Sequence, residues 1–280
     1  MVLYMSSRAN EVSEANSELI RLSGMEVGLA ALNLETGEEI LIHPDQSFHP
    51  ASTMKVCVMM EAFHQARQGL FSLDEMMRVK NEFTSIADGS LYSLSIEDDS
   101  EKDLYEHIGE SFSIRELIFR MITESSNLAT NLLIERLTPE RTTRFMQELG
   151  TNDVIVRRGV EDNQAFRLGL NNAATARGVM QILLELAKRK VVSSEDSDEM
   201  IEILLQQQFN EMIPAQLPAD ASVAHKTGWT GKYYHDMGIV YPPNGNAFVL
   251  AIMTKGFEKE GEAHSFVATL AKMVYEEWAK

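Results

Sequence analysis

Strand-forming patterns lie near both ends of this 280-residue chain, and a long stretch rich in helical patterns separates them. Each strand pattern is a short apolar run bounded by Gly, Pro, Asn or other turn-forming residues, which is typical of antiparallel sheets. The predicted strands are residues 25–33, 39–43, 222–227, 237–241 and 248–253. Strands from the two ends can pair in one sheet, so we expect the helical stretch to be an insertion.

Apolar residues recur at helical spacing in most of the intervening chain, and Ser113 with Glu116 has the pattern of a helix capping box. The predicted helices are residues 11–22, 53–68, 113–125, 128–136, 139–149, 175–190, 197–209 and 261–280. Residues 82–109 are polar and weakly periodic, so we expect an irregular surface segment there. The sequence therefore predicts an α+β fold, with an antiparallel sheet flanked by helices and an inserted all-helical lobe.

This layout predicts two lobes that form one compact unit. Residues 1–49 plus 212–280 would make the sheet lobe, and residues 50–211 the helical lobe. The hydrophobic content of 44% is sufficient for a large shared core. A cleft between the lobes is the natural place for an active site.

The formal net charge of -17 limits the classes of partner. Such an acidic surface repels nucleic acid and anionic lipid, so we expect neither nucleic acid nor a membrane as a partner. The single cysteine, Cys57, cannot form an intrachain disulfide, and its apolar neighbours predict a buried, inert thiol. The oligomeric state stays open.

No segment approaches the ~18 consecutive apolar residues of a membrane-spanning helix. Residues 1–10 also lack the basic region and apolar stretch of a secretory signal. We therefore expect a cytoplasmic protein, or an extracytoplasmic one if an export signal has been removed from it.

Ser52 precedes Lys55 by three residues at the start of a predicted helix. At this spacing both side chains point to the same face, so the Lys55 amine can reach the Ser52 hydroxyl. A serine hydroxyl needs a base to become a nucleophile, and a desolvated lysine can be that base near neutral pH. Taken alone, the pair also fits a helix-capping serine and a surface lysine.

Two later segments carry groups that could assist. Ser125 and Asn127 lie between two predicted helices and supply a hydroxyl for proton relay and an amide for holding a substrate carbonyl. Lys226 and Thr227 lie at the end of a predicted strand and can bind a substrate carboxylate, while Gly228 lets a substrate backbone approach closely. Each segment alone is an ordinary loop or strand end.

Together and in this order, the three segments resemble the S-x-x-K, S-D-N and K-T-G motifs of the penicillin-recognising serine hydrolases, most closely the class A β-lactamase group. The segments are Ser52-Thr53-Met54-Lys55, Ser125-Ser126-Asn127 and Lys226-Thr227-Gly228. The resemblance extends over residues 25–280 and implies a β-lactamase/transpeptidase-like fold. It also implies an acyl-enzyme on Ser52, a small-molecule substrate with a carboxylate, and no cofactor or metal.

The resemblance further implies an oxyanion hole made by the backbone N–H groups of Ser52 and Trp229. Trp229 stands where the family usually has a small residue. We expect its side chain to narrow the groove beside the strand and to favour small or flat acyl groups.

Two departures from the family pattern concern the second motif and the release of the acyl group. Ser126 replaces the aspartate that helps to hold the second motif, and we expect this change to be structural. The candidate deacylating glutamate, Glu161, follows Arg158 by three residues instead of two, and Ala165 stands where the family has asparagine. Glu161 is thus either the deacylation base on a differently bent loop or a structural carboxylate, and we expect Arg158 and Asn172 to bracket this loop.

Three functions remain open on the sequence alone: a β-lactamase, an esterase, peptidase or slowly deacylating penicillin-binding protein of the same fold, and a binding module that has lost catalysis. None of the seven histidines forms a pair at a recognised metal-ligand spacing. His225 is expected to be an ordinary strand residue, and His235-Asp236 lacks the G-x-S-x-G elbow of a Ser-His-Asp hydrolase.

Overall fold

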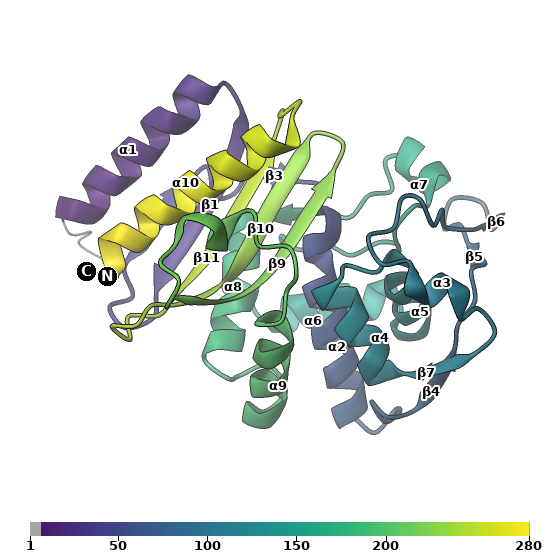
Figure 1. Ribbon diagram of the computed structural model, residues 1–280. Helices are drawn as coiled ribbons and strands as arrows, with labels where there is room; N and C mark the ends of the chain where they lie inside the picture. Colours follow the sequence, from purple (N-terminus) through teal and green to yellow (C-terminus); the bar gives the residue numbers. More distant parts are fainter. Residues whose placement is uncertain (1–6, 280) are drawn as a thin grey trace.

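A five-stranded antiparallel sheet, in the order β2-β1-β11-β10-β9, joins the two ends of the chain in the computed structural model, which describes residues 7–279 (Figure 1). Its strands are β1 (Glu26–Asn33), β2 (Glu39–Ile42), β9 (Ser222–Thr230), β10 (Tyr233–Tyr241) and β11 (Phe248–Lys255). β1 pairs with β11 along its whole length, so the N-terminal hairpin and the C-terminal meander form one sheet. The predicted α+β fold with an antiparallel sheet is confirmed.

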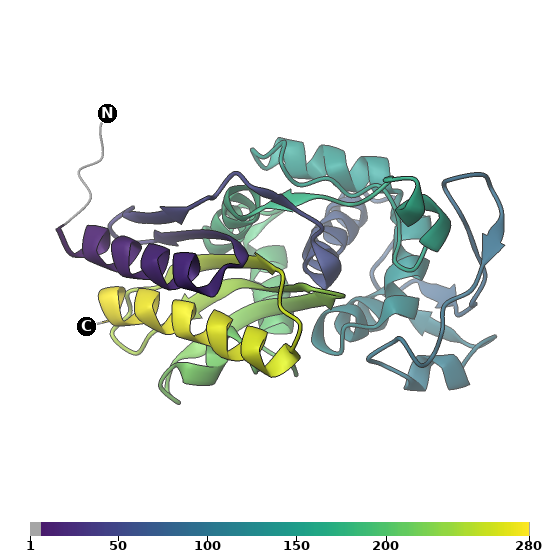
Figure 2. The same cartoon turned by 90° about the horizontal axis from the view of Figure 1, so that it is seen from above.

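Helices cover both faces of this sheet. On one face lie α1 and α10, and on the other lies α8 (Figures 1 and 2). In β11, Leu250 and Ile252 belong to the core on the side of α1 and α10, whereas Val249 and Ala251 belong to the core that includes α8. Successive side chains of a strand alternate between faces, so a strand buried on both sides is apolar throughout. This explains the unbroken apolar run of β11.

The helical stretch between the sheet strands contains most of the helices. The helices are α1 (Ser7–Ser23), η1 (Ala51–Met54), α2 (Lys55–Arg67), α3 (Asp103–Glu106), α4 (Ile114–Thr123), α5 (Asn127–Leu137), α6 (Pro139–Glu148), α7 (Asn163–Arg167), α8 (Ala176–Ala187), α9 (Ser194–Leu204), η2 (Ile213–Gln216) and α10 (Glu260–Trp278). Ser113 caps α4 by accepting from the Glu116 N–H at 3.1 Å, as predicted, while the Glu116 carboxylate pairs with Arg120. The division into lobes 1–49 plus 212–280 and 50–211 stays a prediction.

Two predicted boundaries were wrong in a way that matters for the site. β9 and β10 run on to a tight turn at Gly231 (φ 56°) and Lys232, so Lys226–Thr227–Gly228 lies inside a strand instead of at its end. The helix predicted over residues 197–209 is observed as α9 at Ser194–Leu204. It begins earlier because Ser193 caps it by accepting from the Asp196 N–H. Gly228 is a point of close packing and not a strand end, which sequence pattern alone does not distinguish.

Residues 82–109 contain more order than predicted. The short strands β5 and β6 and the helix α3 lie in this segment, and its residues Leu94 and Leu104 are buried in the hydrophobic core. The remaining short strands pair as β3 with β8, β4 with β7 and β5 with β6; their bounds are β3 (Ser47–Phe48), β4 (Met76–Arg78), β5 (Phe83–Thr84), β6 (Leu91–Tyr92), β7 (Ser111–Ser113) and β8 (Ala174–Thr175). The segment is therefore an ordered part of the helical stretch and contributes to its core.

Cys57 is buried, as predicted, and burial raises the pKa of its thiol to about 12. Among residues 7–279, no helix is both long enough and apolar enough to cross a membrane. The predicted absence of a secretory signal in residues 1–10 falls mostly outside the described residues.

Candidate active site

Ser52 lies in η1, directly before α2 and against the edge strand β9. The preceding Ala51 adopts a left-handed conformation (φ 48°), and its N–H donates to His49 Nδ1 at 3.1 Å. A Cβ atom on Gly228 would lie 2.8 Å from the backbone nitrogens of both Ser52 and Thr53. Only glycine lets β9 approach η1 this closely. The close approach brings the Ser52 N–H next to the strand that carries Trp229.

Lys55 is fully buried one turn after Ser52. Its Nζ donates to the backbone oxygen of Ser125 at 2.7 Å, to Ser125 Oγ at 3.2 Å and to Asn127 Oδ1 at 2.8 Å. In the described chain these are the hydrogen bonds of Nζ, and none goes to Ser52. Burial lowers the pKa of Lys55 to about 7, against the opposing influence of the Asp99 and Glu161 carboxylates. An amine with this pKa can act as a base near neutral pH.

The loop before α5 holds Ser125 in a strained conformation. Ser125 has φ 59° and is 2% exposed. In this conformation its backbone oxygen and its hydroxyl both accept from Lys55 Nζ. Asn127 is the first residue of α5, and Ser126 caps that helix by accepting from the Ala129 N–H at 3.2 Å. Strained backbone of this kind clusters at functional sites. The Ser126 cap agrees with the structural role expected for this substitution.

β9 contributes two fully buried groups to the opposite side. Lys226 Nζ donates to the Thr227 backbone oxygen at 3.0 Å. Burial first and the charge of Lys55 second hold the pKa of Lys226 well below its ordinary value, while Asp236 opposes them. Among the described residues Thr227 Oγ1 is buried and has no hydrogen-bond partner. A buried amine that a bound anion can hold protonated lies beside an unpaired hydroxyl, and together they are suitable partners for an anionic group of a ligand.

Trp229 follows on the same strand and is 37% exposed. Its ring packs edge-on against Phe209, with the ring centroids 5.4 Å apart. The indole forms part of the cleft wall, which is the place predicted for it.

The segment that carries Glu161 is clamped by Asn172. Its Oδ1 accepts from the N–H groups of Arg157 (2.8 Å) and Arg158 (3.1 Å), and its Nδ2 donates to the Arg158 carbonyl at 3.1 Å. Arg158 in turn donates to the Leu170 and Gly159 carbonyls. The prediction that Arg158 and Asn172 bracket the loop is confirmed.

Glu161 lies between the clamp and the catalytic motifs, in a left-handed conformation (φ 59°). Its Oε1 accepts from Asn127 Nδ2 at 2.9 Å, and its Oε2 accepts from the Ser95 N–H at 3.2 Å. Burial raises the pKa of Glu161, and those two hydrogen bonds act in the opposite direction. The carboxylate of Glu161 thus lies against the Asn127 side chain.

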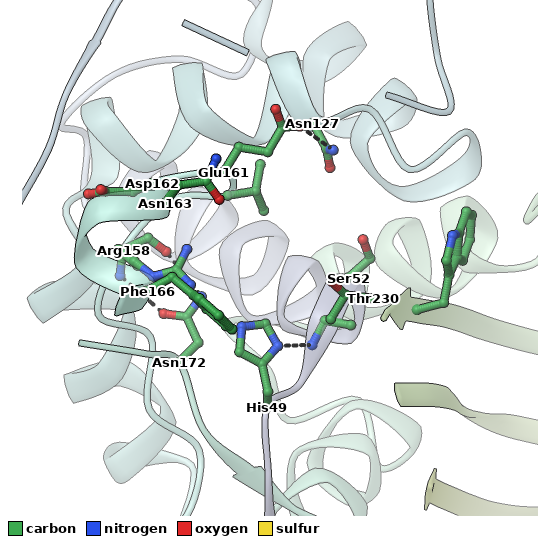
Figure 3. Close-up of a pocket in the computed structure, with 13 residues that line it drawn as sticks. His49, Ser52, Asn127, Arg158, Glu161, Asp162, Asn163, Phe166, Asn172 and Thr230 are labelled. Carbon is green, nitrogen blue, oxygen red and sulfur yellow. Dashed lines mark hydrogen bonds between the residues drawn. The ribbon is translucent and has the colours of Figure 1, made fainter. Parts of the chain in front are cut away.

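A cleft of about 250 Å³ is lined by both Ser52 and Glu161 (Figure 3). His49 and Phe166 form another part of its wall, with ring centroids 6.1 Å apart. Burial lowers the pKa of His49 to about 4, so its ring is neutral at physiological pH. Ser52, Asn127 and Glu161 thus surround a cavity in which a small acyl compound could lie.

Three residues near the site were missed by the sequence analysis. Asp99 is buried against the start of α5, and His49 and Phe166 line the cleft. Asp99 lies in a run of acidic residues where nothing distinguishes it from the exposed Asp98. His49 stands three residues before Ser52, which was the one signal available.

His225 and His235 have structural partners. His225 Nδ1 lies 3.0 Å from Asp236 Oδ1, and both side chains are buried in the sheet. His235 Nε2 donates to the His49 carbonyl at 2.8 Å, so His235 ties β10 to the segment before Ser52. Within the described part of the chain, no group of three or more His, Cys, Asp or Glu side chains is arranged to hold a metal ion.

Comparison with known proteins agrees with this arrangement. A sequence model described as the β-lactamase enzyme family matches residues 11–278. The extended-spectrum β-lactamase PER-1 of Pseudomonas aeruginosa is 22% identical over 262 residues, covering 89% of this chain and 82% of its own. The β-lactamase ROB-1 of Haemophilus influenzae is 28% identical over 255 residues, covering 89% and 78%.

Solved structures share the fold at low sequence identity. The TLA-1 extended-spectrum β-lactamase superposes with a TM-score of 0.85 at 19% identity, covering 98% of this chain and 100% of its own. PBP-A superposes with a TM-score of 0.80 at 24% identity, covering 97% and 95%. A single-residue mutant of PBP-A has been solved as an acyl-enzyme complex with penicillin G.

Proposed function

The chain belongs to the β-lactamase enzyme family, and from that premise we propose that it hydrolyses β-lactam amides through an acyl-enzyme on Ser52. The observation that carries the proposal is the buried amine of Lys55, one turn after Ser52 and hydrogen-bonded to Ser125 and Asn127. A lysine whose pKa is about 7 is neutral in a large fraction of molecules at neutral pH.

Acylation begins when Ser52 Oγ attacks the carbonyl carbon and Lys55 Nζ takes the hydroxyl proton. A neutral amine has two N–H donors, which can stay on the Ser125 carbonyl and Asn127 Oδ1, and its lone pair is then free for that proton. The Ser52–carbon bond forms, and the negative charge moves to the former carbonyl oxygen. The backbone N–H groups of Ser52 and Trp229 are the proposed donors to that oxygen.

The tetrahedral intermediate then collapses and the carbon–nitrogen bond breaks. Ser125 Oγ gives its proton to the leaving nitrogen and recovers one from Lys55, 3.2 Å away. Lys226 and Thr227 hold the substrate carboxylate, because the carboxylate favours the protonated form of the Lys226 amine and Thr227 offers an unpaired hydroxyl beside it.

Deacylation requires a water molecule whose proton is taken by a base. Glu161 is the proposed base, since its carboxylate borders the cleft with Ser52 and its pKa is raised by burial, which makes it a stronger base. Water attacks the acyl carbon, the bond to Ser52 Oγ breaks, and the proton held by Glu161 returns to Ser52. The acyl group leaves as a carboxylic acid.

One observation favours a second candidate, a penicillin-binding protein that deacylates slowly. Both Glu161 oxygens already accept hydrogen bonds, from Asn127 and from Ser95, so part of the carboxylate's capacity is taken up by the protein. A water molecule must bind to the remaining lone pairs.

Intact-mass spectrometry with a penicillin separates these functions. A transient adduct, absent in Ser52→Ala and accompanied by accumulating hydrolysed penicillin, supports the β-lactamase. A persistent adduct supports the penicillin-binding protein, and cleavage of a small ester without any adduct supports an esterase. Absence of all three would leave a binding module. Ser93→Ala removes an exposed serine and should behave as the unchanged protein.

A further inference from the structure

Asp99 is a buried carboxylate that approaches the site from outside the three motifs. It is 3% exposed. Both of its oxygens accept from the Asn127 N–H, at 2.9 and 2.8 Å, and Oδ2 also accepts from the Leu128 N–H at 3.0 Å. The Tyr105 hydroxyl donates to Oδ2 at 3.0 Å, and the Glu101 N–H donates to Oδ1 at 3.2 Å. Four groups of the protein therefore hold this one carboxylate.

The bonded backbone groups belong to the first turn of α5, which spans eleven residues. Backbone N–H groups in the first turn of a helix have no partner within the helix, and the helix dipole favours a negative charge there. Ser126 satisfies the Ala129 N–H with a neutral hydroxyl, whereas Asp99 supplies the negative charge from the neighbouring 82–109 segment. Asp99 thus brings a carboxylate to the start of α5, where the second motif of this chain has Ser126.

We propose that Asp99 is a positioning residue for the Ser52 reaction, because it fixes the first turn of α5 and thereby holds the Asn127 side chain between Lys55 and Glu161. The inference rests on the proposed function of Ser52. Asn127 alone connects Asp99 to the catalytic groups. Its backbone N–H donates to Asp99, and its side chain is hydrogen-bonded to both Lys55 and Glu161.

The charge of Asp99 also acts on Lys55. The charged groups that face the Lys55 amine are Asp99 from the segment before α3, Glu161 from the loop before α7 and Lys226 from β9. Its other neighbours, Ser125 and Asn127, are neutral. The two carboxylates raise the pKa of Lys55, so removing the charge of Asp99 should lower it further. A residue that only stabilised the fold would not produce this shift.

The test is the pH profile of Ser52 acylation by a fluorescent penicillin in Asp99→Asn. The substitution places an amide N–H₂ against backbone donors, and the loss of charge-assisted hydrogen bonds should lower the plateau rate roughly tenfold to a hundredfold. The acid limb of the profile should move to lower pH, because Lys55 stays neutral at lower pH. Asp98→Asn removes a charge of the same sign from the adjacent, exposed residue. This variant should change neither the plateau rate nor the pH of the acid limb.

Two more variants separate positioning from general damage to the fold. Tyr105→Phe removes one hydrogen bond to Asp99 and keeps its charge, so we expect a plateau lowered a few-fold with the acid limb unmoved. Adding Ser126→Asp to Asp99→Asn returns a carboxylate to the start of α5, where aspartate is a favoured cap, and should recover part of the plateau. If Asp99→Asn does not fold, Tyr105→Phe alone decides, and an unchanged plateau there overturns the inference.

The failure of this inference is distinguishable from failure of the proposed function. If the unchanged protein is acylated, and Asp99→Asn has the same plateau rate and the same acid limb in its pH profile, Asp99 has no positioning role. If the unchanged protein is not acylated, the proposed function fails, and hydrogen exchange of the first turn of α5 then decides. If the amide hydrogens of this turn exchange faster in Asp99→Asn than in Asp98→Asn, Asp99 does fix the start of α5. Equal exchange rates in the two variants overturn the inference.

Discussion

The side-chain Nδ2 of Asn127 donates a 2.9 Å hydrogen bond to Oε1 of Glu161. The other end of the same amide, Oδ1, accepts from Lys55 Nζ at 2.8 Å. One side chain therefore connects the proposed base of acylation to the proposed base of deacylation. A change at Asn127 should affect both half-reactions through direct contacts.

Asn127→Ala should lower the rates of acylation and deacylation together. Lys55 loses one of its three acceptors, and the Glu161 carboxylate loses the donor that fixes its orientation, so each rate should fall roughly tenfold or more. Stopped-flow acylation and the decay of the isolated acyl-enzyme measure the two steps separately. Asn163→Ala, at an exposed amide on the same cleft, is the matched control. A loss confined to one step would contradict the bridging role.

Glu161→Gln should turn the protein into one that keeps its acyl group. The amide retains the shape of the carboxylate but cannot accept a proton from water, so deacylation should slow by roughly a hundredfold to ten-thousandfold, the range of general-base effects. Acylation should change only a few-fold. The lifetime of the adduct by intact mass is the measurement, with exposed Glu97→Gln as control. An adduct that clears at the original rate would make Glu161 a structural carboxylate.

The same carboxylate predicts how deacylation depends on pH. Glu161 must be ionised to act as a base, and burial raises its pKa above the ordinary 4.5. The deacylation rate should therefore be highest above this raised pKa and decline as the pH falls through it, at a higher pH than an exposed glutamate would give. Acyl-enzyme lifetimes measured from neutral to acidic pH check this. A decline only below pH 4.5 would contradict it.

The catalytic motifs could be located from the sequence because they are short and keep their chain spacing. Ser52 and Lys55 are one turn apart, and local geometry brings them together. What the sequence left out depends on long-range packing: Asp99 reaches α5 across 28 residues, and only the folded chain distinguishes it from Asp98. The sequence predicts that Gly228 lets a substrate backbone approach and that its segment lies at the end of a strand. Only the folded chain shows that Gly228 lies inside β9, where it lets this strand pass close to η1.

Gly228→Ala should damage the site through backbone contact. Its Cβ would lie 2.8 Å from the nitrogens of Ser52 and Thr53, and backbone atoms cannot move aside as a flexible side chain can. We expect a stability loss of about 1–3 kcal/mol and a large loss of acylation. Urea unfolding and acylation kinetics measure the two effects. Gly261→Ala meets no atom within 4 Å and is the control, expected to keep both. Unchanged acylation in Gly228→Ala would contradict the close approach.

Binding of a carboxylate ligand should be accompanied by proton uptake. Burial and the charge of Lys55 hold the pKa of Lys226 well below its ordinary value in the free protein, and a bound carboxylate raises it again. Calorimetry of a β-lactam with Ser52→Ala, repeated in buffers of different ionisation enthalpy, gives the number of protons taken up. We expect a positive value that falls toward zero in Lys226→Met. Uptake of equal size in both proteins would assign the proton elsewhere.

Acid should destabilise the fold through two histidines, the fully buried His235 and the partly buried His49. Burial holds the pKa values of His49 and His235 at about 4, against 6.5 for an ordinary histidine, so the unfolded chain binds more protons between these values. The free energy of unfolding should therefore be unaffected by these groups above about pH 6.5 and fall as the pH drops toward 4, with a slope of ~1.4 kcal/mol per pH unit for each histidine. Urea unfolding between about pH 7 and 5 measures the slope. His235→Gln, whose amide can still donate to the His49 carbonyl, should lower the slope by the contribution of one histidine. An equal slope in the unchanged protein and in His235→Gln would show that acid acts through other groups.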